Sequence, residues 1–123
     1  MADLGIEVEQ PVPGRTVVAF KGEHDLAQVE DLRRYLSALV ADNELVVADF
    51  SQAQFVDSSI INLLLETKRE ADETQRRFRI QMGTECMVYR VFEVSGVLSF
   101  LECASSREEA LEDDGRADGA VRP

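Results

Sequence analysis

The segment FVDSSIINLLLE, residues 55–66, places Asp57, Ser58 and Ser59 together where a predicted strand ends and a predicted apolar helix begins. A carboxylate beside two hydroxyls at such a boundary has three possible uses. The side-chain oxygens can cap a helix by accepting hydrogen bonds from free backbone amides. A serine can act as a catalytic nucleophile, or its hydroxyl can be modified by another protein. Capping explains one of the three residues well and all three poorly, so these residues alone leave the choice open.

A Ser-His-Asp hydrolase would combine Ser58 with His24, the only histidine of the chain. The sequence contains no GxSxG elbow, which positions the serine in many such enzymes. We expect His24 to be a solvated loop residue, which is the commoner fate of a lone histidine. The sequence therefore disfavours an enzyme.

A receiver-type phosphoacceptor domain would use Asp57 as the acceptor, with Glu23, Asp25 and Thr84 beside it. No lysine follows the last predicted strand, where the sequence is CASS at 103–106. The chain also opens with a predicted hairpin instead of a strand, helix and strand. These two departures weaken the receiver interpretation.

The hydrophobic pattern predicts an α/β fold: a mixed, mostly parallel sheet with an N-terminal hairpin and about four helices. Asp25 is the expected cap of the first helix, and Gly96 is expected to be left-handed at the end of the third. The continuous apolar run LVVADF predicts a strand that is covered on both faces. The expected strands are 5–10, 15–22, 45–50, 78–82 and 98–104, and the expected helices are 25–41, about 59–76, 85–95 and one after a serine cap in SSREEALEDD.

Strands that are separated by helices run parallel through right-handed crossovers, and polar groups gather beyond their carboxyl ends. Three loops are expected to meet there, at residues 22–25, 57–59 and 83–85. The sequence thus predicts one acidic, hydroxyl-bearing edge of the sheet.

The amino-acid composition limits the classes of partner that the chain is expected to bind. The chain has 123 residues, of which 45% are hydrophobic, and a formal net charge of −11. Such a charge repels nucleic acids and anionic membranes, so a basic or amphoteric protein is the expected partner. The N-terminus lacks signal-peptide features and no apolar run is long enough to span a bilayer, which predicts a cytoplasmic protein. We expect one domain over residues 1–112 and a flexible C-terminal tail over 113–123.

The two cysteines, Cys86 and Cys103, form no CxxC motif. Reduced thiols that are buried or half-buried are the expected state of both. The sequence predicts neither a metal site nor a cofactor.

Four segments carry a family resemblance over roughly residues 5–112: FKGEHDLAQVEDL, LVVADFSQAQFVDSS, RFRIQMG, and VYRVFEVSGVLSFL followed by SSREEAL. In their order and spacing they resemble a STAS domain of the anti-sigma factor antagonist type. The resemblance implies a non-enzymatic switch that binds an anti-sigma factor, itself a serine kinase of the GHKL type. Phosphorylation of the first serine after the aspartate, here Ser58, would break the complex, and a serine phosphatase would restore it. A STAS accessory subunit of a transport complex, never phosphorylated, is the alternative.

The resemblance makes Ser58 the phosphorylation site, with six surrounding residues as the expected partner contacts: Glu23, Asp25, Asp57, Ser59, Ile60 and Thr84. Ile60 departs from the family, which usually has glycine at this position. Isoleucine is tolerable in the first turn of a helix, whereas a left-handed backbone would strain it. Ile60 could instead be an exposed apolar contact that changes the choice of partner.

Overall fold

The computed structural model describes residues 4–112. The strands are β1 (Ile6–Val12), β2 (Arg15–His24), β3 (Leu45–Val56), β4 (Arg77–Gln81) and β5 (Glu102–Ala104). The helices are α1 (Val29–Asp42), α2 (Ser58–Glu73), α3 (Tyr89–Ser95) and α4 (Arg107–Ala110), with short 3₁₀ segments η1 (Leu26–Gln28) and η2 (Val97–Phe100). The predicted flexible tail, residues 113–123, lies outside the described residues.

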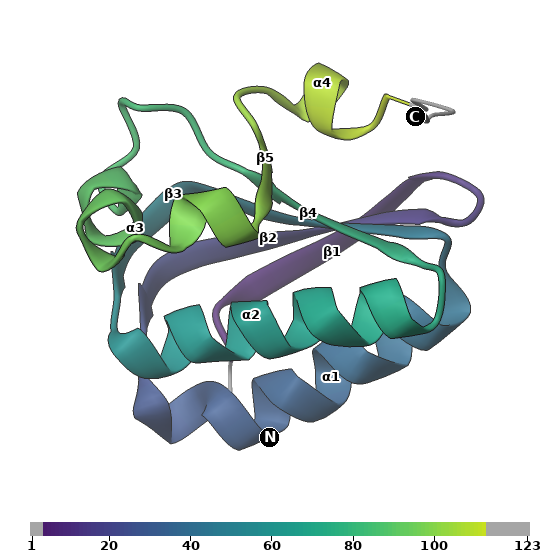
Figure 1. The fold of residues 1–123 in the computed structure, drawn as a ribbon, viewed down its shortest axis with the longest axis horizontal. Helices are drawn as coiled ribbons and strands as arrows, with labels where there is room; N and C mark the ends of the chain where they lie inside the picture. The colour runs from purple at the N-terminus through teal and green to yellow at the C-terminus, as the bar shows by residue number, and fades with distance from the viewer. Residues whose placement is uncertain (1–3, 113–123) are drawn as a thin grey trace.

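The five strands form one sheet in the order β1-β2-β3-β4-β5. β1 pairs antiparallel with β2, and the other three pairings are parallel. Helices α1 and α2 lie side by side against one face of the sheet, and α4 lies over the opposite face (Figure 1). The predicted α/β class, the hairpin and the mostly parallel sheet are therefore confirmed.

Both faces of β3 are buried, which explains the continuous apolar run in its sequence. Val46, Ala48 and Phe50 belong to the main core beneath α1 and α2. On the other face, Leu45 and Val47 belong to a smaller cluster that includes Ala110 of α4. The ring of Phe50 stacks on Phe20 of β2 at 4.6 Å and meets Phe92 of α3 edge-on at 5.5 Å. One strand thus joins both layers, as its sequence indicates.

Several predicted boundaries were wrong. The expected strand at 98–104 is only the three-residue β5, because residues 97–100 form η2. The expected helix at 85–95 begins at Tyr89, after a series of turns. Its predicted glycine cap is confirmed, since Gly96 has φ 77°. The serine cap is also confirmed: Ser106 accepts from the Glu109 amide, although α4 is a single turn.

Cysteine exposure was predicted correctly at only one position. Cys86 is half-buried, but Cys103 on β5 is exposed. β5 lies at the edge of the sheet, so one side of it has no neighbouring strand. Within residues 4–112, no helix combines the length and apolar character that a bilayer crossing requires.

Candidate functional site

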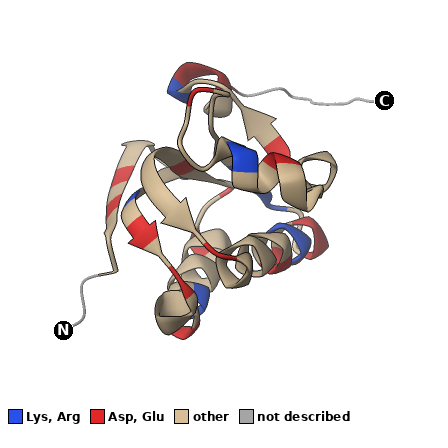
Figure 2. Cartoon of the chain, turned by 90° about the vertical axis from the view of Figure 1, so that its left-hand side faces the viewer, with Lys and Arg blue, Asp and Glu red and all other residues tan. Residues whose placement is uncertain are grey.

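The site is a corner where β2 and β3 end together. The last parallel pairs of these strands include His24 with Val56, whereas β4 stops where Gln81 pairs with Asp49. β2 and β3 therefore run on past β4, and their ends lead into η1 and α2. Figure 2 looks onto this corner, with acidic segments at the ends of both strands. We call the surface formed by residues 23–26 and 55–59 the serine corner.

Asp57 is the N-cap of α2. Its Oδ1 accepts from the Ser59 amide at 3.0 Å and the Ile60 amide at 3.3 Å, and also from the Ser59 hydroxyl. Burial alone would raise the pKa of Asp57, but the hydrogen bonds from Ser59, Ile60 and Leu26 outweigh it and lower the pKa. The carboxylate is therefore held ionised, where it complements the positive end of the helix.

The same carboxylate also joins the two loops of the serine corner. Its second oxygen, Oδ2, accepts from the Leu26 amide of η1 at 3.1 Å. Asp25 caps η1 by accepting from the Ala27 amide, while its own amide donates to the Gln28 side chain. The capping role predicted for Asp25 is confirmed, on η1 immediately before α1. Both carboxylates hold the backbone of the corner in place.

The two serines have different surroundings. Ser59 is half-buried and its hydroxyl donates to Asp57. Ser58, the first residue of α2, is exposed, and within residues 4–112 its hydroxyl makes no hydrogen bond. An approaching protein would therefore reach the hydroxyl of Ser58 without breaking an existing contact.

Ile60 is 0% exposed and lies in the main core. The prediction that it could be an exposed partner contact is wrong, because the first turn of α2 points this side chain inward. Ile60 lies in the first turn of α2, where isoleucine was expected to be tolerated. Its backbone is not left-handed, because Gln75 is the only non-glycine residue with positive φ among residues 4–112. Ile60 packs in the core under the serine corner and anchors the first turn of α2.

His24 was predicted to be a solvated loop residue, and this was wrong. It is the last residue of β2 and is 0% exposed. Its Nε2 lies 3.0 Å from the Lys21 carbonyl oxygen, and its ring packs edge-on against Phe20 at 5.1 Å. Because the imidazole is sealed in the core while Ser58 faces solvent, the two do not form the hydrogen-bonded pair of a hydrolase.

The remaining predicted contacts divide between two places. Glu23 is exposed on β2 and is paired in register with Phe55 of β3, so it belongs to the serine corner. Thr84 is exposed in the turn after β4. The loop at residues 83–85 was predicted to meet the other two loops. Because β4 ends well before β2 and β3, this loop leaves the sheet at a different level from the other two. Within residues 4–112, no hydrogen bond links Thr84 to the corner.

Two apolar residues of the corner were missed. Leu26, directly after Asp25, is 71% exposed, and Phe55, two residues before Asp57, is 48% exposed. The available signal was Phe55 itself, a large apolar residue two positions before the Asp-Ser-Ser run. Aromatic side chains, Phe among them, are enriched at protein-binding surfaces.

The corner therefore combines an exposed hydroxyl, a helix N-terminus and exposed apolar side chains. The model of the STAS domain family matches residues 6–110. The chain belongs to the STAS domain family. No curated protein matches it.

Solved structures agree with this assignment. The anti-sigma factor antagonist SpoIIAA in its unphosphorylated form is 25% identical, with a TM-score of 0.70 over 86% of this chain and 92% of that one. The phosphorylated form of the Bacillus cell fate determinant SpoIIAA is also 25% identical, with a TM-score of 0.66 over 86% of this chain and 96% of that one. An anti-sigma factor antagonist from Mycobacterium paratuberculosis, 23% identical, shares the fold with a TM-score of 0.74 over 86% of this chain and 89% of that one.

Proposed function

We propose that this protein is an anti-sigma factor antagonist whose binding is switched by phosphorylation of Ser58. Unmodified, it binds an anti-sigma factor and frees a sigma factor; phosphorylated, it releases the anti-sigma factor. The observation that carries the proposal is the difference between the two serines, since Ser58 is exposed and Ser59 is engaged with Asp57. Support also comes from SpoIIAA, which was solved in both unphosphorylated and phosphorylated forms.

The switch acts at the interface and leaves the fold intact. A phosphate adds about −1.5 to −2 charges at neutral pH. At Ser58 this charge would meet the N-terminus of α2, which tolerates anions. It would also lie at a corner that already carries Glu23, Asp25 and Asp57. A partner that docks against these residues would then face additional like-signed charge, which weakens binding.

The proposal assigns the chemistry of phosphate transfer to the partner. The anti-sigma factor acts as a GHKL-type serine kinase, and a separate serine phosphatase removes the phosphate. The chain itself contributes the acceptor hydroxyl and the surface around it. His24, its only histidine, is sealed in the core and does not serve Ser58 as a base.

The test compares Ser58→Asp, Ser58→Ala and the matched control Ser59→Ala. Binding to each anti-sigma factor of the source organism is measured by calorimetry, and circular dichroism reports the fold. We expect Ser58→Asp to remain folded and to bind about tenfold or more weakly. Ser58→Ala should bind like the parent protein and resist phosphorylation.

Mass spectrometry after incubation with the bound partner and ATP should locate one added phosphate on Ser58 and none on Ser59. Unchanged affinity of Ser58→Asp, together with no gain in mass, would contradict the switch. Capture of a transport complex instead of an anti-sigma factor would favour the accessory-subunit alternative.

A further inference from the structure

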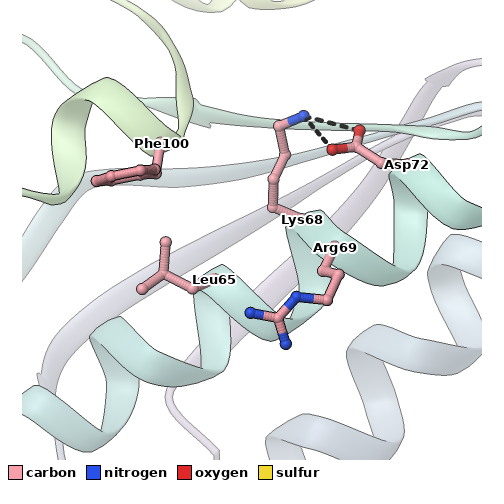
Figure 3. A pocket seen from close by; sticks show the side chains of 5 residues that line it. All are labelled: Leu65, Lys68, Arg69, Asp72 and Phe100. Carbon is pink, nitrogen blue, oxygen red and sulfur yellow. Dashed lines mark hydrogen bonds and ion pairs between the residues drawn. The ribbon is translucent and has the colours of Figure 1, made fainter.

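A groove lies between α2 and η2, away from the serine corner. It is open to solvent, has a volume of about 400 Å³ and is lined by Leu65, Lys68, Arg69 and Asp72 of α2 and by Phe100 of η2. Figure 3 shows the Phe100 ring above Leu65 and the polar side chains farther along the helix. Phe100 is 68% exposed, so the aromatic wall of the groove is open to a partner.

The charges in the groove are not balanced. Lys68 is neutralised by Asp72, four residues farther along α2, since Lys68 Nζ lies 2.8 Å from Asp72 Oδ1. Arg69 is exposed and has no ion pair or hydrogen bond within residues 4–112. In a chain with a net charge of −11, this guanidinium stands unpaired beside an apolar wall. Planar guanidinium groups bind carboxylates well through two parallel hydrogen bonds.

The groove continues the surface that begins at Ser58. Residues separated by three, four, seven and eleven positions share one face of an α-helix. Ser58, Leu65 and Arg69 fit this spacing, and Asn62 between them is exposed. Arg69 is eleven residues from Ser58, which corresponds to about 16 Å along the helix axis. One partner could therefore span both sites.

We propose that this groove is a second contact for the anti-sigma factor, which inserts an apolar side chain between Leu65 and Phe100 and pairs an adjacent carboxylate with Arg69. This inference rests on the proposed function, because it assigns the groove to the same partner. The partner is then basic where it faces the acidic serine corner and acidic where it faces Arg69. A partner with that pattern docks in one orientation only, since the reversed orientation opposes like charges at both sites.

The test measures the affinity of the same anti-sigma factor for Arg69→Glu and Phe100→Ala. Arg34→Glu on α1 is the matched control, because it makes the same charge change at an exposed arginine that pairs with Asp31. We expect Arg69→Glu and Phe100→Ala each to weaken binding about tenfold or more, with Arg34→Glu close to the parent. Thermal unfolding checks that all three variants are folded.

The outcomes separate the two proposals. If the parent binds and Ser58→Asp weakens binding while Arg69→Glu does not, the groove proposal is overturned and the proposed function stands. Equal losses for Arg69→Glu and Arg34→Glu would show a general charge effect and would also overturn it. Parent dimers in sedimentation that Arg69→Glu abolishes would assign the groove to a second copy of the chain instead. If no anti-sigma factor binds the parent protein, both proposals fall.

Discussion

The neighbouring serines Ser58 and Ser59 have different surroundings because the carboxylate of Asp57 binds only Ser59. Asp57 accepts hydrogen bonds from the hydroxyl and the amide of Ser59, which holds that side chain against the cap. Ser58 precedes it on the outer side of the helix start and remains exposed. Of the two serines, one therefore has its hydroxyl bound to the cap and the other has its hydroxyl exposed.

The buried imidazole of His24 makes stability depend on pH. Burial lowers its pKa below 6.5, although the Lys21 carbonyl and the charge of Asp25 act in the opposite direction. Because Nε2 faces a carbonyl oxygen, that nitrogen carries the proton of the neutral ring. Nδ1 is buried without a partner in the described part of the chain. Adding a second proton would place an unsatisfied N–H in the core.

We expect the free energy of unfolding to decrease as pH falls below about 6.5. In this range the His24 imidazole is protonated in the unfolded chain but stays neutral in the folded chain, because its folded-state pKa is lower. The loss should continue until the lower folded-state pKa is reached, at no more than about 1.4 kcal/mol per pH unit. Urea unfolding between neutral and mildly acidic pH measures this slope. His24→Gln removes the titrating group, so a variant with the same slope as the parent would refute the assignment.

At the scale of elements, Asp57 links two segments that are 31 residues apart in sequence, α2 and η1. We expect Asp57→Ala to lower the free energy of unfolding by about 1 to 2 kcal/mol, since it removes the cap of α2 and the acceptor of the Leu26 amide. Asp57→Asn keeps an oxygen in the same place and should cost less. Denaturant unfolding followed by circular dichroism compares the two variants. Equal stability of Asp57→Ala and the parent protein would contradict this role.

Elements with strong periodicity could be predicted from the sequence, and their ends could not. The helical spacing of Leu32, Leu36 and Val40 identified α1, and these residues are buried as that spacing requires. The extension of β3 to Val56 was missed because residues 51–56 are largely exposed and polar. That extension depends on pairing with β2, which is tertiary information. Misplacing the end of β2 also led to the wrong prediction for His24.

The candidate site could also be predicted only in part: its local motif is visible in the sequence, but features that depend on tertiary packing are not. Asp57 and Ser58 follow from a local motif, and the parallel order of the strands predicts that Glu23 and Asp25 lie at the same edge of the sheet. The burial of Ile60 depends on the rotation of α2 against the sheet, which one sequence does not reveal. The groove joins Leu65 to Phe100, which are far apart in the chain and recognisable together only in the fold.

Charge acts at the scale of the whole molecule. A net charge of −11 attracts a basic partner over distances longer than any single contact. We expect the association rate with the anti-sigma factor to fall about tenfold or more between low and high salt, because salt screens this attraction. The dissociation rate should change much less. Stopped-flow mixing at several salt concentrations separates the two rates, and an association rate that is independent of salt would contradict steering.

The margins of the sheet have a consequence for how other chains can join it. β1 forms one margin and carries Glu7 and Glu9, with an irregular register before Val12. The other margin is β5, only three residues long. Charged, irregular or very short outer strands discourage the addition of a foreign strand. Among the described residues, the sheet edges therefore disfavour recognition by backbone extension, the route by which many sheets recruit peptides or aggregate, and favour partners that contact side chains.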